Sequence, residues 1–218
     1  MTSNSVVGEW GNFVFKMIQP ADHPRILQHL KDCLYYRAFY RIGYTKDLDV
    51  EMDAIFQLVL NDGYNLSFFA EDKATGKVAG CRIITMEKAE RPDFPVAGRL
   101  CKGIVKFYYD IVDDCKLKDR YDFTEFPHMF GISVEEEFCR QGLATEIYRR
   151  AIGLMKERGF SWSLVAFISP YSRAAAGRNG FIQLAKRNLT QAVDEDGSAL
   201  YAEADPNDFL DVGVFESN

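Results

Sequence analysis

The feature that most constrains this chain is the stretch from Pro127 to Gly159, in which a buried strand, a short turn and an amphipathic helix follow one another. Residues 128–134 are mostly apolar and are bounded by a proline and by three glutamates, a pattern that predicts a buried strand. From about Gln141 onward, apolar residues recur at spacings of three and four, and Gly159 ends this pattern. Such spacing with a terminal glycine predicts a helix. Such a strand-turn-helix unit indicates an α/β domain.

The turn before this helix has the composition of an anion-binding loop. A helix start leaves backbone N–H groups unpaired and carries the positive end of the helix dipole, so a phosphate group is favoured there. Gly142 and Ala144 keep bulky side chains away, and the N–H groups of residues 140–145 can therefore surround a pyrophosphate closely. A helix that starts with small residues and binds nothing explains the short pattern about equally well, but the strands and helices around it favour a coenzyme.

The segment from Cys139 to Ala144 resembles the (Arg/Gln)-x-x-Gly-x-(Gly/Ala) loop with which the GNAT superfamily of N-acetyltransferases holds the pyrophosphate of acetyl coenzyme A. Cys139 stands where the family has Arg or Gln, so Arg140 would supply the charge from the next position. The resemblance implies acetyl-CoA as co-substrate, bound partly through main-chain groups of the central strand. The coenzyme contacts expected from the loop and the strand are Ile132, Ser133, Val134, Arg140, Gln141, Gly142, Leu143, Ala144 and Thr145.

The remaining elements follow from apolar periodicity and from breaker residues. Asp22 is the expected N-cap of a first helix, and Gly76 is expected in a hairpin turn. Further strands are expected at 13–18, 64–71, 77–86, 160–168, 181–187 and 209–216, and further helices at 48–60 and 98–115. Their order matches the GNAT superfamily nearly end to end. It implies one GNAT domain over residues 1–218, with a mixed twisted sheet of about seven strands, flanking helices and a helical insertion before the central strand.

The composition bounds the classes of partner and ligand. A chain of 218 residues that is 47% hydrophobic suffices for one core, and it contains no apolar run of membrane-spanning length. The N-terminus has no secretory signal, so we expect a cytoplasmic protein, a monomer or a homodimer, without a membrane partner. The net charge of −6 argues against nucleic acid as a partner. The five cysteines lack metal-type spacing, so we expect reduced thiols and no metal.

Several details are similar to the arylalkylamine N-acetyltransferases of invertebrates, which acetylate amines such as dopamine, tyramine, tryptamine and serotonin. In many insect members a Glu-Pro pair near the end of the first helix places the catalytic carboxylate, but here Ala38 and Phe39 occupy these positions. Tyr36, Phe39 and Tyr40 are expected to form an apolar wall for an aromatic amine, with ordinary core packing as the equally weighted alternative. The features that carry the similarity are Ile18-Gln19-Pro20-Ala21-Asp22, the aromatic end of the first helix, the helical insertion, Gly131-Ile132-Ser133-Val134, and Ser172 leading to Gly180-Phe181.

Direct attack of an amine on the thioester requires a base, N–H donors to the thioester oxygen, and a proton source for the departing thiol. We predict His128 as the base, because an imidazole suits a proton shuttle and a period of two places it on the strand face of Ile132 and Val134. Vertebrate arylalkylamine enzymes similarly carry two histidines on this strand, the first of which falls at His128. A structural histidine is the alternative.

Other residues are candidates for the remaining proton transfers. Glu135, Glu136 and Glu137 are second candidates for the base, although a run of like charges is more often a solvated turn. The family's acidic tyrosine falls at Ala176, so Ser172 or Tyr171 is expected to protonate the thiol, with plain helix capping as the alternative.

The leading hypothesis is therefore acetyl transfer from acetyl-CoA to a small primary amine, most simply an arylalkylamine, by direct attack. A polyamine, an amino sugar or a protein amine is an alternative acceptor. The alternative from another class is a coenzyme-binding regulatory protein that keeps the fold without turnover. The missing carboxylate, the missing tyrosine and Cys139 all favour keeping this last hypothesis open.

Overall fold

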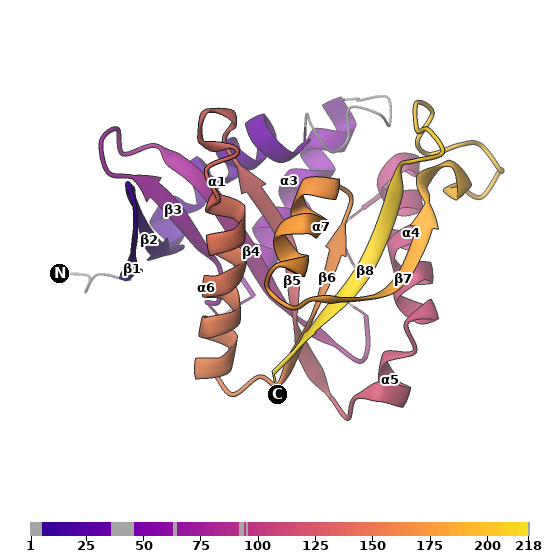
Figure 1. Cartoon of the computed structure of the whole chain (residues 1–218). Helices are drawn as coiled ribbons and strands as arrows, with labels where there is room; N and C mark the ends of the chain where they lie inside the picture. Colours follow the sequence, from indigo (N-terminus) through magenta and orange to yellow (C-terminus); the bar gives the residue numbers. More distant parts are fainter. Residues whose placement is uncertain (1–5, 36–45, 63–64, 92–93, 95, 218) are drawn as a thin grey trace.

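A mixed sheet runs through the described part of the chain (Figure 1). The computed structural model describes all residues except 1–5, 36–45, 63–64, 92–93, 95 and 218. Within the described residues, the sheet has eight strands in the order β1-β2-β3-β4-β5-β6-β8-β7. The strands are β1 (Val6–Trp10), β2 (Phe13–Met17), β3 (Phe68–Asp72), β4 (Val78–Lys88), β5 (Glu125–Val134), β6 (Trp162–Phe167), β7 (Ile182–Asn188) and β8 (Phe209–Glu216).

All neighbouring strands are antiparallel except β5 and β6, which are parallel. This pattern confirms the predicted mixed sheet, and the predicted strands are all present. The edge strand β1 is additional to the expected count. It was missed because it is short, largely exposed and interrupted by Gly8, whose φ of 132° breaks the alternation of a regular strand.

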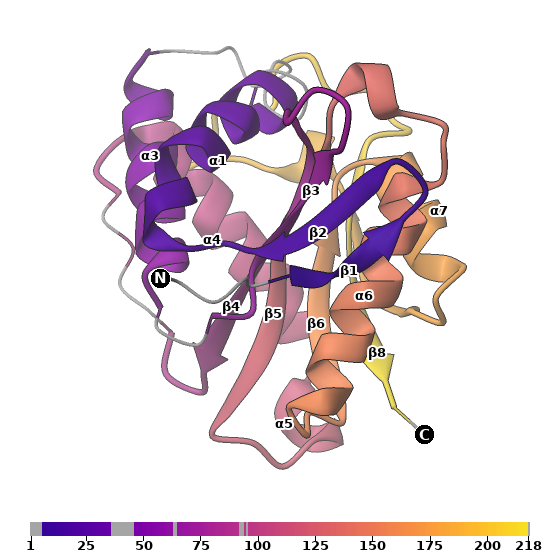
Figure 2. The ribbon, with the colours of Figure 1, turned by 90° about the vertical axis from the view of Figure 1, so that its left-hand side faces the viewer.

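The helices lie on both faces of the sheet, as Figure 2 shows when it is viewed from the β1 edge. On one side lie α1, α3 and α4, and on the other side lie α6 and α7. The long insertion before the central strand is largely the helix α4, as predicted. The helical elements are η1 (Pro20–Asp22), α1 (His23–Leu30), η2 (Lys31–Tyr35), α3 (Lys46–Leu60), α4 (Arg99–Asp114), α5 (Leu117–Arg120), η4 (Glu136–Phe138), α6 (Leu143–Glu157), α7 (Pro170–Gly177) and η5 (Leu189–Gln191).

Two apolar clusters, one on each face, hold these layers together. The cluster beneath α1, α3 and α4 includes Ile83 of β4, whereas the cluster beneath α6 and α7 includes its neighbour Ile84. Both side chains are fully buried, because successive residues of a strand point to opposite faces. The central strands β4 and β5 are thus covered on both faces, and most of their polar side chains are buried, namely Arg82, Thr85, Glu87, His128 and Ser133.

Asp22 occupies the N-cap position of the first helix, as predicted, but the details at both ends of the helix differ from the expected ones. Asp22 does not cap it with a side-chain hydrogen bond; instead, its carboxylate accepts from the amide of Gln19 at 3.0 Å, within the preceding turn η1. At the other end, α1 continues into the π-helical turn η2. Single π turns inside helices often accompany functional sites, because they redirect side chains that a regular helix would space evenly.

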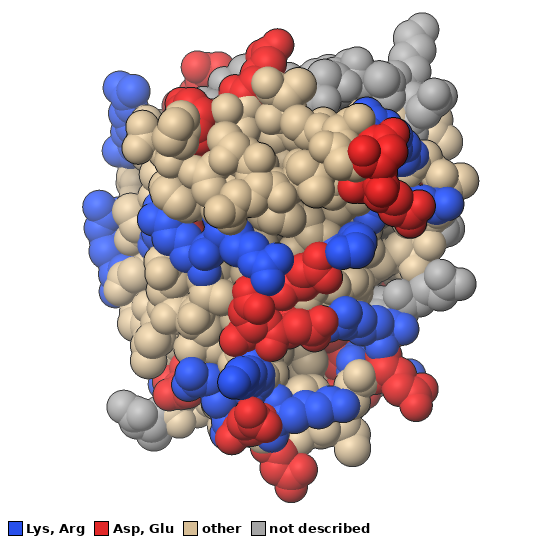
Figure 3. All heavy atoms as spheres, turned by 90° about the vertical axis from the view of Figure 1, so that its right-hand side faces the viewer, with Lys and Arg blue, Asp and Glu red and all other residues tan. Residues whose placement is uncertain are grey.

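Acidic and basic side chains lie side by side on the surface that carries α4 (Figure 3). Lys106 pairs with Asp110 at 2.7 Å within this helix, and Arg187 of β7 pairs with Asp114 at 2.6 Å. Exposed pairs of this kind contribute about 0–1 kcal/mol each, so they affect the surface charge pattern more than the stability. Among the described helices, none combines the length and the apolar character that a membrane span requires.

We expect Gly80→Ala to destabilise the β4–β5 pair. A Cβ at this position would lie 2.7 Å from the main-chain oxygen of Ser133, so one strand must move away. The free energy of unfolding in urea should fall by about 1–3 kcal/mol. Gly153→Ala in α6 is the control, because a Cβ there meets no atom within 4 Å and should add up to roughly 1 kcal/mol through helix propensity. Equal stability of the two variants would contradict the predicted close approach.

Candidate functional site

The strands β5 and β6 separate towards their C-terminal ends. Along these two strands, both fully described, the paired residues are His128 with Leu164 and Met129 with Val165. By contrast, β6 stays paired with β8 along its whole length. The second half of β5 therefore has one edge that no strand covers.

The main chain of Ile132 and Val134 points to this uncovered edge. The amide of Glu135 donates to the carbonyl of Ala79 in β4 at 2.9 Å. In an antiparallel ladder, every second residue directs its N–H and C=O groups towards the same neighbouring strand, so the main-chain groups of residues 135 and 133 both face β4. Ser133, predicted as a coenzyme contact, is thus turned away: its main chain faces β4, and its side chain lies on the face opposite to Ile132 and Val134. Its hydroxyl contacts His29 of α1 at 2.7 Å.

An extra residue in β5 sets which side chains share a face. Gly131 pairs with Ile83 and His128 pairs with Thr85, so Met129 and Phe130 together oppose the single residue Ile84. This is a β-bulge, a feature that is common beside active sites. It overturns the simple period of two on which one prediction depended. Phe130 packs with the α3 and α4 side, whereas Ile132 and Val134 pack with the α6 side. His128 is therefore on the face opposite to Ile132 and Val134.

The turn between β5 and α6 combines two left-handed residues with a helix start. Arg140 has a φ of 62° and Gly142 a φ of 87°, and residues 139–142 are exposed. The first regular bond of α6 runs from the amide of Glu146 to Gly142 at 3.1 Å, so the amides of residues 143–145 precede the helical ladder. Alternating left-handed and right-handed residues turn successive N–H groups inward and form an anion-binding concavity. The predicted loop residues are thus brought together at one exposed end of α6.

His128 is held in a buried cluster on the α4 side of the sheet. Its Nδ1 lies 2.5 Å from a carboxylate oxygen of Glu87, and its Nε2 lies 3.1 Å from the hydroxyl of Tyr108, whose ring stacks on the imidazole. Burial raises the pKa of Tyr108 well above its ordinary value, and Glu87 raises it further. With Glu87 ionised, Nδ1 carries the proton and Nε2 accepts the tyrosine O–H. The arrangement can pass a proton between the imidazole and the carboxylate.

A second polar cluster lies on the other face, below α6. Arg82, opposite Ile132 in the register, is 1% exposed, and its guanidinium lies 4.8 Å from the ring centre of Tyr148. Its Nε and Nη2 are buried without a hydrogen-bond partner among the described residues. Burial lowers the pKa of this guanidinium, and the Tyr148 hydroxyl lies 2.9 Å from the Ser172 hydroxyl. Tyr171, in contrast, is 81% exposed and does not join the cluster.

The predicted amine wall lies outside the described residues, since Tyr36, Ala38, Phe39 and Tyr40 all fall within 36–45. Aromatic side chains do surround the bulge on the His128 face. Phe56 of α3 makes an edge contact with Phe130 at 5.3 Å between ring centres, and Phe94 lies 6.4 Å from Phe130. The partners Glu87, Tyr108, Arg82 and Tyr148 were not singled out in the sequence, because no local motif marks them.

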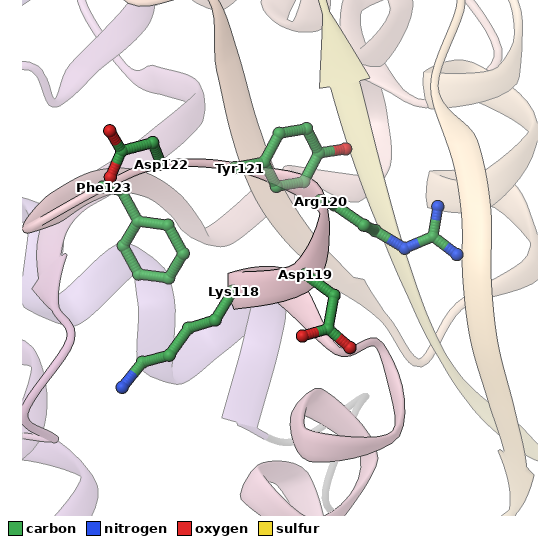
Figure 4. A pocket seen from close by; sticks show the side chains of 6 residues that line it. All are labelled: Lys118, Asp119, Arg120, Tyr121, Asp122 and Phe123. Carbon is green, nitrogen blue, oxygen red and sulfur yellow. The ribbon is translucent and has the colours of Figure 1, made fainter.

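A surface depression of about 380 Å³ lies between α5 and the start of β5. It is lined by residues 118–123, whose side chains are drawn in Figure 4. The Tyr121 hydroxyl donates to Glu216 at 2.5 Å, and its ring stacks on Trp162 with the ring centres 4.1 Å apart. The depression is formed by one continuous segment, at the end of β5 opposite to the glycine turn. It does not gather groups from several elements, which distinguishes it from the two clusters beside β5.

No protein-family model matches the chain, and no curated protein is similar to it in sequence. Solved structures are similar in fold. A yellow fever mosquito protein named arylalkylamine N-acetyltransferase 7 is 19% identical with a TM-score of 0.83, covering 94% of this chain and 88% of its own. Arylalkylamine N-acetyltransferase 2 from Aedes aegypti is 20% identical with a TM-score of 0.81, covering 95% and 100%. The Drosophila melanogaster polyamine N-acetyltransferase, which forms N-acetylagmatine, is 12% identical with a TM-score of 0.76, covering 94% and 99%. The chain has the fold of these acetyltransferases, the GNAT fold.

We predict that Arg82→Met stabilises the protein in the absence of ligands. A buried guanidinium with two unpaired nitrogens carries a desolvation cost of several kcal/mol, which a contact with one aromatic ring, worth about 2 kcal/mol, does not offset. The free energy of unfolding should rise by about 1–4 kcal/mol in urea denaturation. Arg150→Met is the matched variant and should lose stability, because Arg150 pairs with Glu146 at 2.8 Å and donates to Glu9 at 2.7 Å. A marked loss for Arg82→Met would show that the guanidinium is already satisfied.

Proposed function

We propose that the protein is an acetyl-CoA-dependent N-acetyltransferase that acts on a small primary amine by direct attack. The observation that carries this proposal is the uncovered edge of β5 next to the amide-rich turn at the start of α6. Together they offer an anion site and a line of free main-chain donors, which suit a pyrophosphate and the extended arm attached to it. The fold shared with known acetyltransferases supports the proposal.

The residues fit a coenzyme that lies on the α6 side. Amides of residues 140–145 would hold the pyrophosphate, with Arg140 adding positive charge at an exposed position. The main-chain groups of Ile132 and Val134 would bind the arm, which delivers the thioester to the bulge at Met129 and Phe130. Bound coenzyme supplies the activated acetyl group. The buried, unpaired nitrogens of Arg82 on the same face are a further sign that an anionic or polar group belongs there.

The amine would approach from the opposite face, because α6 and the coenzyme occupy the first one. On that face His128 and Phe130 flank the bulge, and Glu87 and Tyr108 support the imidazole. In this proposal His128 accepts the proton of the ammonium group by way of Tyr108, whose hydroxyl gives its proton to Nε2 and takes up the amine proton, directly or through water, and Glu87 stabilises the resulting imidazolium. The acidic family residue near the end of the first helix, absent here at Ala38, is thereby replaced by groups from the strands β4 and β5.

On the coenzyme face, Tyr148 and Ser172 would provide the proton for the departing thiol. Their hydroxyls are 2.9 Å apart and connect α6 with α7 at the place where β5 and β6 separate. The Arg82 guanidinium beneath the tyrosine ring would stabilise negative charge that develops on sulfur or on the phenol oxygen. Ser172 keeps its predicted role in this scheme, Tyr148 joins it, and Tyr171 does not.

An aromatic amine is the acceptor that the described residues favour. Phe56, Phe94 and Phe130 line the face from which it would enter. A polyamine or agmatine-like acceptor is the second candidate, since the chain carries a net charge of −6 and resembles the Drosophila enzyme in fold. A panel of dopamine, tyramine, serotonin, spermidine and agmatine with acetyl-CoA should release thiol most rapidly with the aromatic amines. Coenzyme binding without thiol release from any amine would favour a regulatory protein.

We expect Gly142→Glu to weaken acetyl-CoA binding at least about 100-fold in isothermal titration calorimetry. The added carboxylate would face the pyrophosphate, and its backbone would resist the φ of 87°. Gly153→Glu provides a matched control, because it places the same charge on α6 about 16 Å away at 1.5 Å per residue, in open space. Both variants should retain the far-ultraviolet circular dichroism of the parent. Equal affinity of the two would refute the pyrophosphate assignment.

For His128→Gln we predict a fall in kcat of about 10²- to 10⁴-fold, with loss of the acidic limb of the pH–rate profile. The amide cannot exchange a proton with Glu87, although it fills a similar volume. Acetyl-CoA affinity should stay the same, since the coenzyme occupies the other face. His23→Gln, at the start of α1, should leave kcat and its pH profile as they are. A profile of His128→Gln that keeps the parent's shape would assign the proton transfer to another group.

A further inference from the structure

A third polar cluster joins α1 to the end of β5 and has no part in the proposed transfer. His29 and Cys33 lie four residues apart on one face of the helix that runs through α1 and η2, and Glu135 follows β5. The Cys33 Sγ is 3.7 Å from His29 Nδ1 and 3.0 Å from Glu135 Oε2, and the latter two atoms are 3.9 Å apart. Three different donor types thus converge on one point.

These separations are close to those around a tetrahedral zinc ion, and a small movement of the Glu135 carboxylate away from Cys33 and towards His29 would complete the match. Zinc bonds of about 2.3 Å to sulfur and about 2.0–2.1 Å to nitrogen or oxygen place neighbouring ligand atoms roughly 3.3–3.6 Å apart. The observed values lie within a few tenths of an ångström of this range on either side. A thiolate, an imidazole and a carboxylate are also the ligand types that select zinc over magnesium or calcium.

The surroundings of His29 are those of a metal ligand. Its second nitrogen, Nε2, lies 2.7 Å from the Ser133 hydroxyl, which in turn lies 3.3 Å from Cys81 Sγ. A hydrogen bond at the far nitrogen fixes the ring and its tautomer, as is usual for zinc-bound histidine. With Nε2 donating to the Ser133 hydroxyl, the Nδ1 lone pair faces Cys33 and Glu135.

We propose that His29, Cys33 and Glu135 bind a zinc ion, with Ser133 supporting the histidine and a fourth position left for water. The Cys33 thiol loses its proton on binding, and the thiolate, the neutral imidazole and the carboxylate form the three bonds. The Glu135 side chain is 34% exposed, which provides a route for the ion from solvent. The bound ion would tie α1 to the end of the central strand. This proposal does not rest on acetyl transfer.

Metal binding is tested on the whole chain after treatment with a chelator. We expect titration with zinc chloride to show one equivalent bound and a raised Tm. Cobalt(II) chloride should produce the intense d–d bands of a tetrahedral site together with a thiolate-to-cobalt charge-transfer band. The absence of the charge-transfer band from the unmodified chain would overturn the proposal, irrespective of how any variant folds.

Variants assign the ligands. Cys33→Ser should abolish the charge-transfer band and lower zinc affinity by more than 100-fold, whereas Cys139→Ser, at an exposed cysteine outside the cluster, should change neither. Ser133→Ala removes the support of His29 and should lower affinity about 10- to 100-fold while the band remains. Unchanged affinity in Cys33→Ser, or loss of binding in Cys139→Ser, would show adventitious binding elsewhere and refute the site.

Discussion

The geometry of the proposed coenzyme site depends on how the peptide N–H and C=O groups of the central strand β5 find hydrogen-bond partners. At His128 and Met129 the strand has partners on both sides, and beyond the bulge its only strand partner is β4. Buried peptide groups without partners cost about 1–3 kcal/mol each, so such an edge persists only where solvent or a ligand meets it. The divergence is imposed by the bulge on one side and by the complete β6–β8 pairing on the other. A ligand arm with its own amides can repeat the pattern of a missing strand.

The same logic applies to the turn before α6. Arg140 is not a glycine, and yet its φ of 62° is in the left-handed region, which costs a residue with a Cβ roughly 1–2 kcal/mol. This conformation directs the amide of Arg140 and the amides that follow it towards a common point. An anion bound at that point would compensate for the conformational cost. Cys139, the departure from the family pattern, is exposed at the rim and leaves these main-chain directions unaffected. In the proposed anion site, the main chain would therefore contribute more than the side chains.

The sequence predicted most elements because helix and strand periods are local. The order of the elements along the chain, the inserted helix α4 and the glycine turn before α6 can each be predicted from patterns among residues that are close in sequence. The bulge could not be predicted in this way, since it is a property of the register between β4 and β5. Its omission put His128 on the wrong face. The partners of His128 were missed for a related reason: Glu87 and Tyr108 reach it from another strand and from a helix, and nothing in their local sequence distinguishes them.

Adjacent residues of β4 separate two opposite electrostatic environments. Cys81 points to the α1 face, where it contacts Ser133 beside the His29, Cys33 and Glu135 cluster, while Arg82 points to the α6 face and lies under Tyr148. Because successive side chains of a strand point to opposite faces, the groups that we propose to bind zinc lie on one side of β4. The Arg82 guanidinium lies on the other side. The two clusters do not contact each other, because their side chains point to opposite faces of the sheet. The ions that we propose for them therefore differ in sign, an anion on the α6 face and a cation on the α1 face.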